Sequence, residues 1–367
     1  MIKHKEGEKK EQNAFSLFEG WAKRHWPYLA GGAFLVIAVS MGLLAYALYS
    51  PSEDEKGLVN AEPETEAMSS DGLAARCLDG LKVPVEQSCL LPRAVMIENH
   101  FDARPLAGIA EASIVFEAPV EGGITRLMAV FDASTTVQEI GPVRSARPYY
   151  VEWAQSLGAI YAHVGGSPEA LNRIGGLMDF KNLDEMAGEN YFWRSKTRSA
   201  PHNVYTNSEN LNECQDKKGW EPAVEFKPWV FIDQDPDFIA GDVREITVPY
   251  FGSYKVKWVY DEESGLYERY VGGEADKDKK GDAIYYKNIL VIFTEERTLD
   301  DVGRLFIRTT GSGKALYFSG GEAVEAVWSR NSNEFYTIKT ADGRDVGMAR
   351  GNTWVHIASS PKYEPIY

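Results

Sequence analysis

The chain has 367 residues, of which 44% are hydrophobic, and its formal net charge is −15 at pH 7. This length and composition allow one or two packed cores of about 150 residues each. So acidic a chain argues against a general nucleic-acid binder, which needs a broad basic face to neutralise phosphates, and any anion site must therefore be local.

The first feature along the chain is an uncharged apolar run from Tyr28 to Tyr49. About 20 apolar residues at about 1.5 Å each span the hydrocarbon of a bilayer as a helix. Lys23 and Arg24 precede the run, and acidic residues follow it. Because positive charge flanks the cytoplasmic end of a span, we predict a cytoplasmic tail over residues 1–27, a single transmembrane helix over 28–49 and an extracytoplasmic remainder in the cell envelope.

A cleaved signal peptide is the alternative to this membrane anchor. Ala45 and Ala47 flank Tyr46 in the small-x-small spacing that signal peptidase prefers, with cleavage after Ala47. The long N-terminal region and the length of the apolar run favour a retained anchor. Since no cysteine lies near the run, we expect a peptide anchor rather than a lipidated cysteine.

Residues 50–72 are acidic, poor in apolar residues and without periodicity, which is typical of a disordered linker. The three cysteines beyond it are Cys77, Cys89 and Cys214, and none lies in a CxxC pair, so neither a cysteine zinc site nor a thioredoxin-like motif is supported. In an oxidising compartment Cys77 and Cys89 could form a disulfide that leaves Cys214 over. Three free thiols are the alternative.

Residues 73–214 alternate between β-like and helix-like patterns. The β-like runs are 94–97, 113–117, 127–132 and 159–164. The helix-like stretches are 149–157 and 168–173. This alternation predicts an N-terminal α/β domain over 73–214.

A polar segment over residues 215–228, which contains Pro222, predicts a linker between domains. Residues 229–367 then show strand patterns separated by turn signals. The expected strands are 254–260, 266–271 and 284–294. The expected turns are 262–265, 311–313, 319–321, 341–344 and 350–352. We predict a mostly β C-terminal domain, with Trp258, Trp328 and Trp354 in its core, and an α+β fold for the whole chain.

The densest polar motif is GPVRSARP at residues 141–148, which opens a helical pattern. Ser145 can cap this helix and Pro148 fits its first turn, so Arg144 and Arg147 are expected at the helix start. Helix N-termini attract anions, and arginine binds carboxylates or phosphates bidentately. The motif therefore predicts an anion site. In the alternative, both arginines pair with nearby acids, for which Glu117 and Glu121 are the candidates.

A second glycine-containing loop includes His163, Gly165, Gly166 and Ser167, and it is followed by Pro168. Ser167 can cap a helix that begins at Pro168, and the two glycines could let a phosphate approach the backbone. An ordinary strand-to-helix turn needs the same residue types, and this alternative is favoured because the loop lacks the lysine and the spacing of a Walker loop.

Two further loops add polar residues that sites often use. Residues 121–126 include Arg126, and residues 194–203 include Arg198, His202 and Asn203.

Metal and nucleophile chemistry have weaker support in the sequence. His100, His163 and His202 fall in the first predicted domain, with Asp102 near one of them, so a His/carboxylate metal site is conceivable. No HExxH or comparable spacing is present, so hydrogen-bonding roles are favoured and no metal or cofactor is predicted. The sequence also lacks a GxSxG elbow and an SxxK motif, so we do not expect a hydrolase with a serine nucleophile.

Four motifs taken together resemble a known family. The segments beginning at residues 92, 140, 162 and 198 read PRAVMIENHFDARPLAGIAEASIVFEAPVEGGITRLMAVF, IGPVRSARPYY, AHVGGSPEA and RSAPHNVYTN. They look like the YerB-like lipoprotein family, bacterial envelope proteins with two domains of unknown function. The resemblance implies an extracytoplasmic location and a two-domain plan, and it supplies no reaction. The expected peptide anchor departs from the lipidated cysteine of the lipoprotein members.

Three functions follow as hypotheses. The first is an envelope module that binds an anionic glycan, a peptide carboxylate or a phosphate in an arginine-rich pocket. Its predicted site residues are Arg126, Arg144, Ser145, Arg147, His163, Gly165, Gly166, Ser167, Arg198, His202 and Asn203, with Glu117 and Glu121 as acidic partners. The second is a Mg²⁺-dependent transferase or hydrolase acting on polyprenyl-phosphate-linked glycans, in which case Mg²⁺ is a cofactor. The third is a non-catalytic scaffold for another envelope protein.

Overall fold

The computed structural model describes residues 72–233, 241–252 and 254–367. All of these residues belong to one compact unit. The predicted tail over 1–27, the predicted transmembrane helix over 28–49 and, apart from Gly72, the predicted linker over 50–72 lie outside the described residues. Within the described part of the chain, no helix has the length and the hydropathy that crossing a membrane requires.

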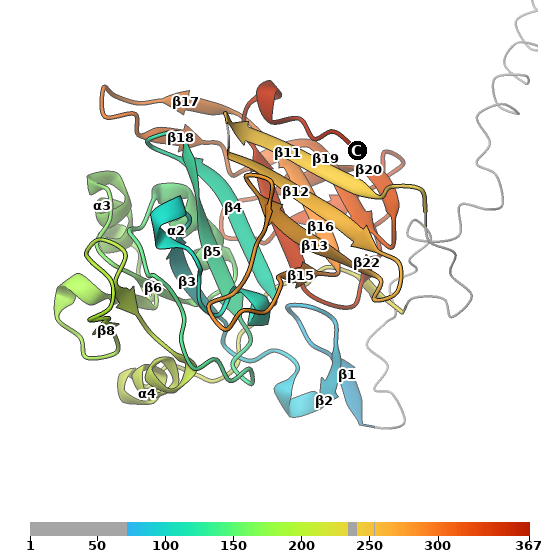
Figure 1. Cartoon of the computed structure of the whole chain (residues 1–367). Helices are drawn as coiled ribbons and strands as arrows, with labels where there is room; N and C mark the ends of the chain where they lie inside the picture. The colour runs from blue at the N-terminus through green and yellow to red at the C-terminus, as the bar shows by residue number, and fades with distance from the viewer. Residues whose placement is uncertain (1–71, 234–240, 253) are drawn as a thin grey trace, which may run out of the picture. The chain divides into compact units, whose positions relative to one another are not determined.

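The first part of the described chain mixes strands and helices (Figure 1). Its strands are β1 (Leu73–Ala75), β2 (Lys82–Pro84), β3 (Arg93–Glu98), β4 (Ile114–Val120), β5 (Ile124–Phe131), β6 (Ile160–His163), β7 (Asn182–Asp184), β8 (Trp193–Arg194) and β9 (Val204–Tyr205). Its α-helices are α2 (Pro148–Ser156), α3 (Pro168–Gly176) and α4 (Ser208–Lys218), and its 3-10 helices are η1 (Val85–Gln87), η2 (Phe101–Ala103), η3 (Ile109–Glu111) and η4 (Glu185–Ala187).

The second part consists almost entirely of strands. They are β10 (Phe231–Ile232), β11 (Glu245–Phe251), β12 (Tyr254–Asp261), β13 (Leu266–Val271), β14 (Glu274–Ala275), β15 (Tyr285–Tyr286), β16 (Asn288–Phe293), β17 (Glu296–Thr298), β18 (Leu305–Ile307), β19 (Gly311–Ser319), β20 (Glu322–Arg330), β21 (Thr337–Lys339), β22 (Met348–Ala349) and β23 (Thr353–Ala358), with η5 (Pro361–Tyr363) after them. The described chain is therefore mostly β with three α-helices, which is consistent with the predicted α+β class.

One sheet of ten strands runs through both parts. Its order is β21-β20-β19-β16-β23-β4-β5-β3-β6-β7. β23, near the C-terminus, lies between β16 and β4 and is parallel to both. At the other end of the order, β6 is parallel to β3 and β7 is parallel to β6. Strands from residues 73–214 and from residues 229–367 thus share one continuous hydrogen-bonded sheet.

The centre of the large sheet is buried on both faces. In β3, β4 and β23 every residue is buried, which is typical of central strands covered on both sides. Successive side chains point to opposite faces, so alternate residues of each strand enter two separate hydrophobic clusters. One cluster contains Val95, Val115, Leu127, Ile289 and Trp354, and the other contains Met96, Phe116, Met128, Leu290 and Val355.

A smaller sheet covers one face of the large one. It contains β11-β12-β13-β14, with β15 pairing to β13. β12 alternates between buried and more exposed residues, so one face of this sheet is apolar and the other meets solvent. The buried face packs through aromatic rings, because the Trp258 ring lies 5.3 Å from the Trp354 ring at an interplanar angle of 65°.

Helices α2 and α3 cover the opposite face of the large sheet, whereas the buried residues Leu211 and Cys214 of α4 lie in the first cluster. α2 buries Tyr149, Tyr150 and Trp153 in the second cluster, where the Trp153 ring stacks on Phe116 at 5.1 Å. Proline occupies the first turn of both α2 and α3, as the sequence predicted, and Ser167 caps α3 through its hydroxyl. The predicted cap at Ser145 is wrong, because α2 begins after Arg147, whose side chain makes no capping hydrogen bond.

The predicted strands and helices of the first part are confirmed within one to three residues at each end. The predicted core positions of Trp258, Trp328 and Trp354 are also confirmed, since all three side chains are fully buried. α4 was not predicted, and it extends to Lys218, so the first residues of the expected linker 215–228 are helical.

One predicted turn is wrong. Residues 311–313 begin strand β19 instead of forming a turn. Gly313 pairs directly with Trp328, and a Cβ atom at Gly313 would lie only 2.7 Å from the indole Nε1 of Trp328. Glycine is therefore present because the cross-strand indole covers the backbone closely, which is a packing requirement that a sequence pattern does not distinguish from a turn.

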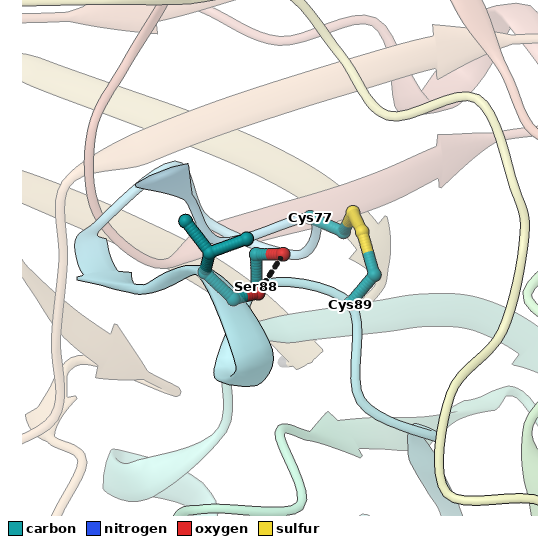
Figure 2. The surroundings of a disulfide bond; sticks show 4 residues. Cys77, Ser88 and Cys89 are labelled. Atoms are coloured by element: carbon teal, nitrogen blue, oxygen red, sulfur yellow. Dashed lines mark hydrogen bonds between the residues drawn. A yellow bond between two sulfur atoms is a disulfide. The ribbon is translucent and has the colours of Figure 1, made fainter. Parts of the chain in front are cut away.

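A disulfide closes the loop at the start of the described chain. Cys77 and Cys89 are bonded, and Figure 2 shows the bridge beside Ser88. The dashed line there is the hydrogen bond from the Ser88 hydroxyl to the Val85 backbone oxygen at 2.8 Å. The Ser88 backbone C=O also accepts a hydrogen bond from the Cys77 N–H at 2.7 Å. Cys214 is free and buried. The loop rests on the large sheet through Asp79, whose carboxylate accepts the Ser113 hydroxyl at 2.8 Å.

Candidate functional site

Three arginines gather at one end of the large sheet, and we call Arg126, Arg144 and Arg147 the three-arginine cluster. Arg126 lies in β5, while Arg144 and Arg147 lie in the extended segment that precedes α2. Nη1 of Arg126 donates to the backbone oxygen of Ser145 at 3.1 Å, which joins the strand to this segment. The segment is held by a hydrogen bond from the Arg144 N–H to the Met96 backbone oxygen at 2.9 Å.

Two members of the cluster have carboxylate partners. Arg147 forms a bidentate ion pair with Glu121, with N···O distances of 2.8 Å from both Nε and Nη2. Nε of Arg144 donates to Glu98 at 2.5 Å. Glu121 is one of the two acidic partners expected from the sequence, whereas Glu98 is a partner that the sequence did not indicate.

Arg126 has no carboxylate partner among the residues that the structure describes. Its side chain is buried, with 4% of the residue exposed, and its Nε has no hydrogen-bond partner. Burial and the positive charges of Arg147 and Arg144 lower the pKa of Arg126, while Glu98 opposes them. The net effect is a buried guanidinium that lacks a full counter-charge.

Glu117 is not part of this cluster, which corrects its assignment as a partner of Arg144 or Arg147. Along a strand, side chains alternate between faces, and Glu117 points to the face covered by the smaller sheet. There its Oε2 lies 2.9 Å from Nη2 of Arg269, and both side chains are fully buried. The Trp354 indole N–H donates to the same carboxylate at 2.9 Å.

The predicted phosphate loop has most of its polar groups engaged within the fold. His163 is buried, with Nδ1 at 2.7 Å from the Gly165 backbone oxygen and Nε2 at 2.8 Å from the Asn182 side-chain oxygen. The Gly165 N–H donates to Asp184 at 2.7 Å. Gly166 pairs as a bridge with Ala146. These contacts build the strand-to-helix turn, and they leave the three-arginine cluster as the better place for an anion.

The loop over residues 194–203 divides between two roles. Arg198 donates to the backbone oxygens of Ala103 at 2.5 Å and Pro105 at 3.1 Å, so it fixes a neighbouring loop. The Asn203 side-chain oxygen accepts from Arg194 at 3.2 Å. His202 instead reaches the cluster, since its Nδ1 lies 4.0 Å from Oε2 of Glu98.

The buried His356 lies beside Glu117 and connects Trp258 to Tyr250 through hydrogen bonds. The Trp258 indole N–H donates to Nε2 of His356 at 2.8 Å, so Nδ1 carries the proton of the neutral ring and faces the Tyr250 hydroxyl at 3.1 Å. Burial lowers the pKa of His356 to about 4, against the attraction of Glu117, whose nearest oxygen is 3.7 Å away. A second ring proton would point at the indole N–H, which explains why the neutral form is preferred.

This geometry predicts that stability falls on acidification before most carboxylates titrate. Because the pKa of His356 is lower in the folded chain than its usual 6.5, the unfolded chain takes up the proton first. The contribution of His356 is therefore complete above about pH 6.5 and is lost as the pH falls towards about 4. Urea unfolding at a series of pH values should show this slope for the wild type and a flatter one for His356→Gln. Equal slopes in the two proteins would contradict the assignment.

Comparison with known proteins gives consistent matches for both parts of the chain. Residues 78–221 match the domain described as "Protein of unknown function (DUF3048) N-terminal domain", and residues 246–355 match the corresponding C-terminal domain. A Bacillus subtilis (strain 168) protein described as "Putative lipoprotein YerB" is 32% identical over 286 residues, which cover 76% of this chain and 85% of that protein. The crystal structure of YerB from Bacillus subtilis aligns with a TM-score of 0.71 and 28% identity, covering 79% of this chain and 99% of that one.

Proposed function

The chain belongs to the DUF3048 family of YerB-like proteins, and from this premise we propose that it is a membrane-anchored, extracytoplasmic envelope protein that binds an anionic ligand at the three-arginine cluster. The resemblance that the sequence motifs indicated is confirmed by the family matches. The similarity to a protein described as a lipoprotein supports a location at the outer face of the membrane. The apolar run from Tyr28 to Tyr49 would serve as the anchor.

The buried, uncompensated charge of Arg126 is the observation that carries the proposal. An ion removed from water without a partner costs several kcal/mol, and most folds avoid that cost by pairing the charge. Here the neighbours worsen the imbalance, because Arg144 and Arg147 are also cations while only Glu98 and Glu121 oppose them. The cluster of three arginines and two glutamates therefore has a net charge of +1, which one carboxylate or phosphate oxygen would neutralise.

The arginine geometry also limits the class of ligand. Arg144 and Arg147 are only partly buried, so their guanidinium groups remain reachable from solvent while Arg126 lies deeper. The chain is strongly acidic overall, which disfavours long polyanions and favours a small or terminal anionic group. A peptide carboxylate, a phosphate or an acidic sugar of an envelope polymer has that chemistry.

The test compares thermal unfolding of the full chain in detergent with and without muropeptides, polyprenyl pyrophosphates or teichoic-type phosphates. A ligand at about 100 times its Kd should add roughly 2.7 kcal/mol of stability to the wild type. Arg126→Met should abolish this gain, since it removes the central charge while keeping the apolar bulk. In the absence of ligand, the same variant should be as stable as the wild type or more stable, because a buried unpaired ion has been removed.

The matched control is Arg173→Met, which removes an exposed arginine of α3 that pairs with Glu152 at 2.9 Å. This variant should keep the full response to the anion. If no anion stabilises the wild type, and Arg126→Met melts well below it, the arginine holds the fold together and the proposal fails in favour of the scaffold. Retention of the anion response by Arg126→Met would also overturn it.

A further inference from the structure

Two histidines that are far apart in the sequence meet beside the Glu98–Arg144 pair. His100 caps η2 directly after β3, and His202 comes from the loop before β9. Their rings stack with centroids 5.6 Å apart and an interplanar angle of 16°. The Asp102 carboxylate joins them, with Oδ2 at 3.5 Å from Nδ1 of His100. One nitrogen of each histidine and one oxygen of Asp102 all lie within 4.8 Å of one another.

One ring nitrogen of each histidine in this group has no strong hydrogen-bond partner among the described residues. Nδ1 of His202 is buried and has no hydrogen-bond partner among the described residues, although Oε2 of Glu98 lies 4.0 Å away. Nδ1 of His100 accepts only a 3.2 Å bond from the Asp102 N–H, and water can satisfy that exposed N–H instead.

The side chains are also reachable from solvent. The Asp102 side chain is 78% exposed and the His100 side chain is 41% exposed, so an ion can enter without opening the fold. In a tetrahedral site with bonds of about 2.1 Å, neighbouring ligand atoms lie roughly 3.4 Å apart, so small side-chain rotations would close the present group on an ion.

We propose that His100, Asp102 and His202 form a binding site for a divalent transition metal ion such as Zn²⁺. Two imidazoles and one carboxylate are a ligand set that suits zinc, whereas Mg²⁺ and Ca²⁺ prefer all-oxygen sites. Three protein ligands leave a fourth position open for water or for a ligand group. The site rests on its own residues and does not depend on anion binding by the three-arginine cluster.

The experiment measures metal binding alone, on the full chain in detergent and without a histidine tag. Equilibrium dialysis with Zn²⁺ should give about one ion per chain, and Co²⁺ should give the visible absorption of a tetrahedral site that Zn²⁺ abolishes by displacement. His100→Ala and His202→Ala should each weaken binding by at least about tenfold. Asp102→Asn should weaken metal binding by roughly tenfold. Because Asp102 is exposed, this substitution should not impair folding.

The matched control is His4→Ala/His25→Ala, which removes two histidines elsewhere in the chain and should leave binding unchanged. Two outcomes would overturn the proposal. One is failure of the wild type to hold Zn²⁺ or Co²⁺ at micromolar concentrations. The other is full binding by His100→Ala/His202→Ala. Because no anion is present in these measurements, neither outcome bears on the proposed function.

Discussion

Replacing Arg269 by methionine is expected to lower the free energy of unfolding by about 3–5 kcal/mol. The guanidinium is fully buried between the two sheets, where it pairs with Glu117 at 2.9 Å and also with Asp276. It also lies over the Trp354 ring, 4.3 Å from the centroid. Methionine would fill much of the volume, but it would leave the buried Glu117 carboxylate without a cationic partner and leave Asp276 paired with Arg104 alone. Urea unfolding at neutral pH would measure the loss.

A second substitution separates this mechanism from lost packing. The double variant Arg269→Met/Glu117→Gln should recover part of the stability, because it removes the carboxylate that the first substitution leaves unpaired. As a surface control, Lys257→Met breaks an exposed pair with Glu245 at 2.8 Å and should cost less than about 1 kcal/mol. An Arg269→Met loss no larger than this control would show that the buried network does not hold the sheets together.

Removing the disulfide with Cys77→Ser/Cys89→Ser is expected to cost about 3 kcal/mol. The bridge spans 12 positions in the sequence, and closing a loop of that size restricts the unfolded chain. The loop also places Asp79 against Ser113 at the start of β4, so its release would loosen one end of the large sheet. Denaturant unfolding of the wild type and the double variant in the absence of reductant gives the difference.

Reductant provides the control for this second result. Adding it should destabilise the wild type by a similar amount and leave the double variant unchanged. Cys214→Ala, which alters the remaining free thiol, should keep the sensitivity to reductant. A wild type that unfolds identically with and without reductant would contradict a stabilising role for the bridge.

Local patterns were enough to predict several of the longer strands and two of the three described α-helices. The apolar run at residues 94–97 became β3, and the proline and cap signals at Pro148 and Ser167 marked α2 and α3. These signals lie within a few neighbouring residues, so they can be read from the sequence without knowledge of the tertiary contacts. α4 escaped prediction because its sequence is strongly polar, with Leu211 and Cys214 as its buried apolar side chains.

The candidate site was predicted in part. The arginines were identified, and the pairing of Arg147 with Glu121 matches one of the acidic candidates. Glu98 was missed although it lies directly opposite Arg126 in the antiparallel pairing of β3 and β5. That information depends on the register between two strands, which a single sequence does not supply. For the same reason, Glu117 could not be placed on the other face from Arg126.

The position of β23 has a consequence for how the protein is made. The strand starts at Thr353, yet it separates β16 from β4 at the centre of the large sheet. As the chain is synthesised from its N-terminus, β4 must wait with an open hydrogen-bonding edge until residues 353–358 have been made. A nonsense mutation a few codons before position 353 should therefore be as damaging as one near the middle of the gene.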